Sequence, residues 1–509
     1  MQSVSFFVML ISQQTRKRGI LMKITLQSDA KKICISVLNE TRIDEIIAKS
    51  EFKLTRPCGG NGTCGKCKVK AVGNLSEMSG DEKRFLTKEE IGANIRLACY
   101  ASVTGDANIT LITSNEQIQG VTDGYFPDFK KSPLTGDKNC YAMAIDIGTT
   151  TIAGYFYKMP ECFCVKQACR TNPQTQFGAD VISRIQFANE GGLKTLQKAV
   201  QDEIESMKTE FGEPVELSVI TGNTTMLHLF SGLDPSGIAV SPFTPKSLFG
   251  IFQENFYLPP CISAYVGADI TTAILASNMQ KDGSSLLIDI GTNGEMAYWS
   301  NGGFTCCSTA AGPAFEGAGI SCGMPAVSGA IDRVWLENGT IRYRTINHAK
   351  PTGICGSGLM DAAACLLKAG IIEDSGYMED DFTFPDSAVT ITAADIRQIQ
   401  LAKAAIRAGI ETLVPNGAGL DCVYIAGGFG SYVDIESCIT IGLLPPSFQN
   451  KVQVLGNAAG TGAAMILQST ECLEKAKEIA GISKTAELSA NPQFMEHYMQ
   501  QMMFPSDFA

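Results

Sequence analysis

Apolar and polar residues alternate differently on the two sides of residue 140. Upstream, short runs with a period of two predict strands at 23–27, 33–38 and 68–72, and apolar residues at helical spacing predict a helix at 42–47. Downstream, longer apolar runs alternate with helical patterns, which is typical of an α/β domain. The pattern therefore predicts a small α+β domain followed by a larger α/β domain.

The turn residues and the apolar pattern together divide the chain into five segments. The first is predicted to be a mis-assigned start or a flexible arm, because the first regular strand pattern begins only at Met22. The others read as the small domain, a polar linker, the large domain and a helical tail whose apolar face packs on the core. The boundaries of these segments are 1–21, 22–114, 115–139, 140–480 and 481–509.

Three cysteines lie in a glycine-rich loop with the spacing C-x5-C-x2-C, and a fourth follows about thirty residues later. These residues are Cys58, Cys64, Cys67 and Cys99. The layout is that of a plant-type 2Fe-2S cluster, with one more residue in the first gap than the C-x4-C-x2-C form. The order of predicted strands around the loop fits a ferredoxin-like β-grasp domain. This segment is therefore predicted to carry electrons.

The large domain contains an internal repeat. The pentapeptide Ile-Asp-Ile-Gly-Thr ends an apolar strand at 145–149 and again at 288–292, which predicts two related halves. Glycine lets backbone N–H groups approach phosphate oxygens, threonine hydroxyls add hydrogen bonds, and the aspartate can hold Mg²⁺. A third strand ends in the pair Gly427-Gly428, which suits a nucleoside lying against the backbone. No P-loop sequence is present.

These motifs, in this order, resemble the actin, heat-shock-chaperone and sugar-kinase ATPases over about residues 140–470. The resemblance implies a two-lobed α/β ATPase that binds ATP with Mg²⁺. It also implies two phosphate hairpins and a glycine pair beside adenosine. The residues concerned are Asp146, Gly148, Thr149 and Thr150 in the first hairpin, Asp289, Gly291, Thr292 and Asn293 in the second, and Gly427 and Gly428.

One further acid, Asp269, opens a predicted helix that runs toward the second hairpin. In the chaperone ATPases a carboxylate at the corresponding place orients the attacking water, and the resemblance implies that role here. The alternative is a helix N-terminal carboxylate stabilised by the helix dipole. The sequence leaves both interpretations open.

The combination of a 2Fe-2S domain with this ATPase resembles the ATP-dependent reductive activators of corrinoid proteins. Four more stretches resemble that family, at 172–185, 222–228, 308–317 and 353–358. The resemblance implies transfer of one electron from the cluster to Co(II), which regenerates Co(I) for methyl transfer. The implied partners are the corrinoid protein of a methyltransferase system and an upstream electron donor. A homodimer is compatible with the sequence.

The sequence is also compatible with other functions. The chain could be an ATP-driven electron donor to another low-potential enzyme, as in the activators of 2-hydroxyacyl-CoA dehydratases. It could also be a redox-sensing or assembly module that binds ATP, or a small-molecule kinase with an attached ferredoxin. The other cysteines, including Cys162, Cys164 and Cys169, fit core or sheet positions better than a second metal site.

Composition narrows the partners, the cellular compartment and the kinds of metal site that this chain can have. A net charge of −11 argues against nucleic acid and anionic membranes as partners. Eighteen cysteines without a secretory signal favour a reducing compartment, and we expect a cytoplasmic protein. Only three histidines are available, which argues against a metal site built from imidazoles. No apolar run in the chain reaches 18 residues, so no membrane span is predicted.

Overall fold

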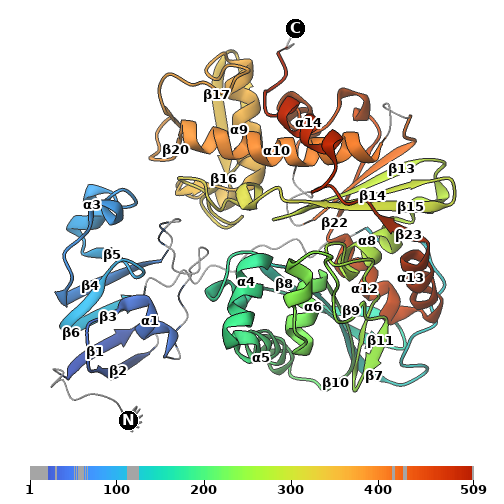
Figure 1. Ribbon diagram of the computed structural model, residues 1–509, viewed down its shortest axis with the longest axis horizontal. Coiled ribbons are helices and arrows are strands. Elements are labelled where there is room, and N and C mark those ends of the chain that lie inside the picture. Colours follow the sequence, from blue (N-terminus) through green and yellow to red (C-terminus); the bar gives the residue numbers. More distant parts are fainter. Residues whose placement is uncertain are drawn as a thin grey trace. The chain divides into compact units, whose positions relative to one another are not determined.

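The protein is described by a computed structural model that places residues 21–28, 31–50, 52, 54, 62, 65, 67–111, 125–414, 419–427 and 433–506. The chain divides after residue 114 into two compact units, each of which is described by itself. Figure 1 shows the helices and strands of both units.

The first unit is one mixed sheet with short helices. Its strands are β1 (Met22–Gln27), β2 (Lys32–Val37), β3 (Thr41–Arg42), β4 (Lys68–Leu75), β5 (Ile95–Leu97) and β6 (Ser102–Leu111). Its helices are α1 (Ile43–Ala48), α2 (Gly80–Lys83) and α3 (Lys88–Gly92). The sheet order is β2-β1-β6-β4-β5, with β1 and β6 parallel and β3 paired to β6. This order confirms the predicted ferredoxin-like β-grasp fold.

The core of the first unit forms where α1 covers the sheet. Ile24 and Ile109 from the central strands and Ile46 from α1 are almost completely buried in one apolar cluster. Beside it, Arg96 forms a bidentate ion pair with Glu82, at 2.8 and 2.9 Å, and both side chains are buried. Because a buried charge is tolerated only when it is paired, this bond fixes β5 against α2 just before Cys99.

The second unit is built from two lobes, each with its own sheet. The first lobe contains β7 (Cys140–Ile147), β8 (Thr151–Met159), β9 (Phe163–Thr171), β10 (Val215–Gly222), β11 (Ile251–Gln253), β12 (Phe256–Leu258), α4 (Val181–Phe187), α5 (Leu193–Phe211), α6 (Thr224–Ser231), α7 (Ser236–Ala239) and α8 (Ala268–Ser277). The sheet of the second lobe contains β13 (Ser285–Ile290), β14 (Gly294–Ser300), β15 (Gly303–Thr309), β21 (Cys422–Ala426), β22 (Val452–Gly456) and β23 (Ser483–Thr485).

The remaining elements all follow β15 in the chain. They are β16 (Ala330–Glu337), β17 (Thr340–Thr345), β18 (Gly353–Ile354), β19 (Phe382–Thr383), β20 (Thr390–Ile391), α9 (Gly356–Lys368), α10 (Ala393–Leu413), α11 (Ile435–Thr440), α12 (Ala458–Gln468), α13 (Thr470–Ile482) and α14 (Pro492–Gln500). Helices α12 and α13 pack against α8 of the first lobe, and the others belong to the second lobe (Figure 1).

The two lobes repeat one topology, as the sequence repeat predicts. The first sheet runs β12-β10-β7-β8-β9 and the second runs β22-β21-β13-β14-β15, in the same order of parallel and antiparallel neighbours. Both central strands, β7 and β13, are apolar on both faces because helices cover both sides of each sheet. The predicted two-lobed actin-like fold is confirmed.

Helices α8 and α12 cross between the two sheets and share one buried cluster with residues of β7 and β13. The crossing is very close: a Cβ placed on Gly462 of α12 would lie 1.9 Å from the carbonyl oxygen of Thr272 on α8. Helix α10 packs on the other face of the second sheet, where Leu286 and Ile288 point. Helix α5 covers the first sheet with Leu196, Val200 and Ile204, spaced four residues apart.

The ends of the large domain differ in detail from the sequence prediction. The segment from 125 to 136, expected to be linker, is bonded along the second unit, where Leu134 N–H donates to the Leu467 carbonyl. Past residue 480, strand β23 pairs with β15 and so extends the second sheet. The predicted tail helix is confirmed as α14, but it ends at Gln500. Met495 and Met499 are exposed, so only part of the expected apolar face packs.

The segment 1–21, predicted to be a mis-assigned start or a flexible arm, lies outside the described residues except for Leu21. Within the part of the chain that the structure places, none of the helices combines the length and apolar character needed to cross a bilayer.

The helix crossing gives a direct test of the lobe interface. Gly462→Ala should lower the free energy of unfolding by about 1–3 kcal/mol, because the added methyl group must push α12 away from α8. Gly481→Ala in the neighbouring helix α13 is the matched control, since a Cβ there meets nothing within 4 Å. It should be neutral or stabilising by up to about 1 kcal/mol. Denaturant unfolding of both variants measures the difference, and equal effects would contradict the proposed close crossing.

Candidate functional site

The two hairpins predicted to bind phosphate open into one cleft of about 290 Å³ between the lobes. Asp146 lies near the end of β7 and Asp289 near the end of β13. Each is followed by a tight turn, closed by a bond from Gly148 N–H to Thr151 O (2.9 Å) and from Gly291 N–H to Asn293 O (3.0 Å). The predicted residues that line the cleft are Asp146, Gly148, Thr149, Thr150, Asp269, Asp289, Gly291, Thr292, Asn293 and Gly427.

Glycine is required where the neighbouring parallel strand ends beside each hairpin. A Cβ on Gly427, whose φ is 99°, would lie 2.5 Å from the Ile290 carbonyl oxygen and 2.7 Å from Asp289 Oδ1. Gly222 occupies the equivalent place in the first lobe and would meet the Ile147 carbonyl oxygen at 2.6 Å. Gly427 therefore lines the cleft, whereas Gly428 lies outside the described residues.

The first turns of the crossing helices α8 and α12 lie at the floor of the cleft. Asp269 lies in the first turn of α8, and its Oδ1 accepts from the N–H of Ile270 at 2.8 Å. Asn457 caps α12 and donates from Nδ2 to Asp146 Oδ2 at 3.0 Å. The sequence analysis missed Asn457, although an Asn before an Ala-rich helical run is a recognisable N-cap signal.

The carboxylates in the cleft repel one another; Glu295 is buried, and the three aspartates beside it are half-buried. Burial, and then the charge of Asp146, raise the pKa of Asp289 to about 7. Burial raises the pKa of Asp146 to about 6, although the Asn457 hydrogen bond opposes the shift. Burial together with Asp289 and Asp146 raises the pKa of Asp269, and burial with Asp269 raises that of Glu295. Without a cation, the cleft therefore holds protons near neutral pH.

Glu295 and Glu316 are cleft residues that the sequence analysis did not select. Glu295 pairs with Asp289 across β13 and β14, and Asn293 donates to it at 3.2 Å. Its only sequence signal is its place two residues after the second hairpin. Glu316 accepts from the hydroxyls of both hairpins, Thr150 at 2.6 Å and Thr292 at 3.0 Å. That contact joins residues 166 and 24 positions apart, which no local pattern could indicate.

A buried arginine supports the first hairpin from below. The guanidinium of Arg184 is fully buried and donates to the carbonyls of Thr149 and Gly178, at 2.5 and 2.9 Å. Burial lowers its pKa to about 9, and Asp180 and Glu316 oppose that shift. Even at this pKa the group is a cation at neutral pH, so it places positive charge beneath the predicted phosphate site.

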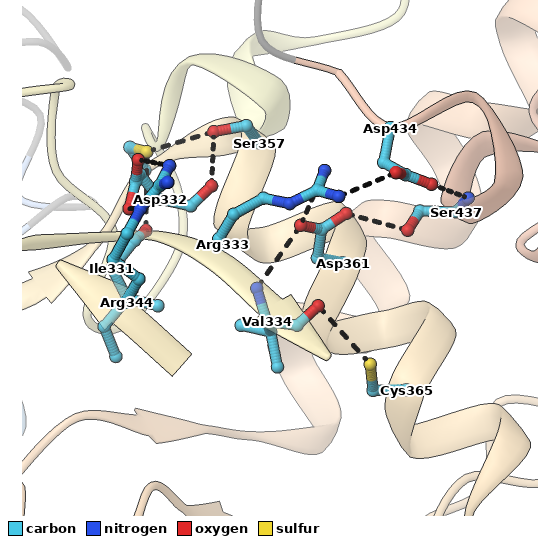
Figure 2. Close-up of polar contacts among 11 residues, drawn as sticks. Ile331, Asp332, Arg333, Val334, Arg344, Ser357, Asp361, Cys365, Asp434 and Ser437 are labelled. Atoms are coloured by element: carbon cyan, nitrogen blue, oxygen red, sulfur yellow. Dashed lines mark hydrogen bonds and ion pairs between the residues drawn. The ribbon is translucent and has the colours of Figure 1, made fainter. Parts of the chain in front are cut away.

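A polar network fixes the elements around the second side of the cleft. Arg333 of β16 bonds Asp434, the N-cap of α11, at 2.8 Å, while Asp361 of α9 accepts from Ser437 at 2.7 Å and from Val334 N–H at 3.3 Å (Figure 2). The network joins β16, α9 and α11 into one block. In the chain, α11 follows Gly427, the glycine predicted to lie beside the nucleoside.

In the first unit, the cysteine positions fit a cluster as far as they are described. Cys67 Sγ and Cys99 Sγ lie 3.2 Å apart in a buried position, although 32 residues separate them in sequence. Gly62 and Gly65 of the same loop have φ of 74° and 63°, and a Cβ on either would overlap Tyr100 or Phe85. Tyr100 Oη also donates to Gly62 O at 2.8 Å. Cys58 and Cys64 lie outside the described residues.

The other cysteines follow the strand pattern. Cys164 and Cys169 lie on β9, as the alternation predicts, and Cys162 precedes it. Among the residues placed by the structure, no three His, Cys, Asp or Glu side chains are arranged to enclose a metal ion directly. Mg²⁺ does not need such an enclosure, because it keeps several waters and binds through one or two carboxylates plus substrate phosphates.

The first unit is thus a ferredoxin-like region. The second has the fold and the paired hairpins of the actin, sugar-kinase and heat-shock-chaperone ATPases, abbreviated ASKHA. A sequence profile described as "C-terminal domain of RACo the ASKHA domain" matches residues 283–509, and one described as "RACo middle region" matches residues 141–282, which form the first lobe. The chain belongs to the RACo family of corrinoid activators, as its similarity to known members shows.

Three relatives support this assignment. The corrinoid activation enzyme RamQ of Eubacterium limosum is 30% identical, and the match covers 92% of this chain and 97% of that protein. The [Co(II) methylated amine-specific corrinoid protein] reductase of Methanosarcina barkeri is 26% identical over 67% of this chain and 72% of that protein. A solved structure of a reductive activator for corrinoid, iron-sulfur protein is 29% identical, has a TM-score of 0.66, and covers 95% of this chain and 98% of its own.

The raised carboxyl pKa values predict the pH dependence of stability. A folded pKa above the unfolded value means that the folded protein binds more protons between about pH 4 and 7, so stability should fall as pH rises through that window. Asp289→Asn removes one titrating group. It should therefore stabilise the metal-free protein at pH 8, on the order of 1–2 kcal/mol, and should have little effect at pH 4.

Thermal unfolding at pH 4.5 and pH 8, with EDTA present, measures this difference. Asp202→Asn, an exposed aspartate on α5, is the control and should show no pH-dependent gain. A parallel shift of both variants at both pH values would contradict the assignment of the slope to the cleft.

Proposed function

We propose that this chain reactivates the corrinoid protein of a methyltransferase system by passing one electron to Co(II), with ATP binding and hydrolysis driving the transfer. The observation that carries the proposal is the convergence of both Asp-Ile-Gly-Thr hairpins on one cleft, in a chain whose other unit brings Cys67 and Cys99 together. The similarity to RamQ over 92% of the chain supports the same activity.

The cysteine loop accounts for the electron-carrying part. Cys58, Cys64, Cys67 and Cys99 would hold a 2Fe-2S cluster, which supplies a one-electron donor. The protein contributes the burial of Cys67 and Cys99, and the close packing of Tyr100 on the loop. An upstream electron donor must reduce this centre before each transfer.

The cleft accounts for the ATP-dependent part. The backbone N–H groups of the two hairpins and the hydroxyls of Thr149, Thr150 and Thr292 would bind the phosphates, with Arg184 adding positive charge from below. Asp146 and Asp289 would bind Mg²⁺ through water or directly, which removes the repulsion that raises their pKa values. The Gly427 turn and the Gly428 that follows it would lie against adenosine.

Asp269 is the residue we assign to the attacking water. It sits at the cleft floor opposite the hairpins, and its pKa is raised by burial and by Asp289 and Asp146. A cation on those two aspartates would lower that pKa again and leave Asp269 as an ionised acceptor. Such a carboxylate can orient water for in-line attack on phosphorus, giving ADP and phosphate.

Coupling requires two states of the protein with different affinities for the corrinoid protein or for its cobalt oxidation states. Reducing Co(II) is uphill for a 2Fe-2S donor, so one state must favour Co(I) and the other must release the product. ATP can shift the balance only by the difference in its own affinity for the two states. The cleft between two lobes is the natural place for that difference, because ATP contacts both lobes only when they are close.

Removing a cluster ligand should separate the two activities. Cys67→Ser should abolish ATP-dependent reduction of Co(II) corrinoid protein and lower iron and acid-labile sulfide, while leaving ATP binding within about twofold of the unmodified protein. Cys34→Ser, an exposed cysteine of the same unit, is the control and should retain reduction. The readout is the Co(I) absorbance with and without ATP. Full reduction by Cys67→Ser would refute the role of this loop.

Changing the acid assigned to the attacking water should affect turnover more than binding. Asp269→Asn should lower the rate of phosphate release about 10²-fold or more, because a positioned base contributes of that order. The affinity for a non-hydrolysable ATP analogue should change little. The exposed Asp202→Asn again serves as control. Unchanged turnover in Asp269→Asn would favour the alternative role, a carboxylate that only stabilises the start of α8.

A further inference from the structure

Glu316 connects the two phosphate hairpins across the cleft. Its Oε2 accepts from Thr150 Oγ1 of the first hairpin at 2.6 Å, and its Oε1 accepts from Thr292 Oγ1 of the second at 3.0 Å. One carboxylate thus occupies a hydroxyl donor from each lobe. These are the same donors that the phosphates of ATP would need.

The chemistry of the two anions is similar. An ionised carboxylate and a phosphate both act only as hydrogen-bond acceptors, and both are favoured by the nearby Arg184 guanidinium, which is fully buried. Their charges repel each other, so both cannot occupy this point together without a cation between them. Glu316 is only half-buried, and its side chain therefore has room to leave the cleft.

The backbone that carries Glu316 is tied to the rest of the second lobe. Gly317, with φ of 76°, lies against Met324, since a Cβ there would meet the Met324 carbonyl oxygen at 2.6 Å. Met324 N–H donates to Ile354 O at 2.9 Å, and Ile354 N–H donates to Cys322 O at 2.9 Å. Ile354 lies two residues before α9, which begins at Gly356 and lines the same cleft.

A second tie leads to α10. Ser321 N–H donates to Asp395 Oδ1 at 2.7 Å, and Asp395 also closes the N-terminal capping box of α10 with Thr392. Helix α9 is in turn joined to β16 and α11 by the network of Arg333 and Asp361 (Figure 2). Hydrogen bonds therefore connect the segment that follows Glu316 to α10 and to the block formed by β16, α9 and α11.

We propose that Glu316 is a cross-lobe latch, a positioning residue whose carboxylate holds the threonine hydroxyls of both hairpins in the nucleotide-free protein and is displaced by the phosphates of ATP. Displacement frees the loop 317–324 and loosens the start of α9. ATP then bridges the two lobes in place of Glu316. The latch rests on the proposed ATP-binding function and adds to it the contact that changes between the two states.

Glu316→Gln tests the latch, because the amide keeps the shape of the side chain but loses its charge and can accept from only one hydroxyl. The variant should bind MgATP about five- to tenfold more tightly, the difference expected between a charged and a neutral hydrogen bond. Titration calorimetry on the full chain measures the affinity. Glu379→Gln, an exposed glutamate of the same lobe, is the charge-matched control and should bind as the unmodified protein does.

Hydrogen exchange supplies a readout that a merely structural role would not change. Amides of 317–324 should exchange faster when the unmodified protein binds a non-hydrolysable ATP analogue, and should already exchange at that faster rate in nucleotide-free Glu316→Gln. Unchanged or weaker MgATP binding by Glu316→Gln, or exchange in 317–324 that ignores the nucleotide, would overturn the latch. Weaker binding only when Mg²⁺ is present would instead identify Glu316 as a magnesium ligand.

The two proposals fail in different ways in this experiment. If the unmodified protein does not bind MgATP at all, the proposed ATP-dependent function is wrong, and the latch falls with it. If the unmodified protein binds MgATP normally and Glu316→Gln does not bind it more tightly, the latch alone is wrong.

Discussion

The close crossing of α8 and α12 is the contact on which the rest of the ATPase unit depends. Gly462 allows the backbone of α12 to lie against the Thr272 carbonyl of α8, and no side chain of any size fits there. This crossing brings the first turns of the two helices to one place. Asp269 and Asn457 consequently reach the ends of β7 and β13, where the hairpin aspartates lie. A wider crossing would leave two separate half-sites.

The same convergence creates an electrostatic strain. Asp146, Asp269, Asp289 and Glu295 all have raised pKa values, because four acidic groups share a poorly hydrated floor. A protein gains no stability from such a cluster. A cation that enters with the nucleotide relieves the repulsion, so the strain becomes part of the affinity for Mg²⁺ and phosphate. The site is therefore organised for an occupant, and the stability of the protein depends on pH for that reason.

Charge balance also explains how the two lobes can respond to a ligand. Arg184 places positive charge beneath the first hairpin. Glu316, from the second lobe, accepts a hydrogen bond from Thr150 of that hairpin, so a carboxylate of the protein itself links the two lobes when no nucleotide is bound. The segment that follows Glu316 is also bonded to the residues just before α9 and to the start of α10. An exchange of one anion for another at a single point can thus alter contacts in both lobes, as coupling between distant sites requires.

Local sequence determined a large part of this molecule. The spacing of Cys58, Cys64, Cys67 and Cys99 indicated the cluster loop, and the repeated pentapeptide indicated two related lobes with a phosphate hairpin in each. Both signals are local, because a short loop and a strand-turn unit express their geometry within about ten residues. The repeated topology of the two sheets agrees with the second signal, and the described residues predicted in the two hairpins line the cleft.

Tertiary structure alone decided which distant groups meet. Glu316 contacts Thr150 across 166 positions, Asn457 contacts Asp146 across 311, and Glu295 enters the acidic floor only because β14 pairs with β13. The exposed methionines of α14 likewise depend on how that helix lies on α10. Such contacts depend on the packing of whole lobes, whose geometry no local pattern of residues encodes. The cysteine loop and the two hairpins could therefore be predicted from the chain, while Glu316, the carboxylate that joins the two hairpins, could not.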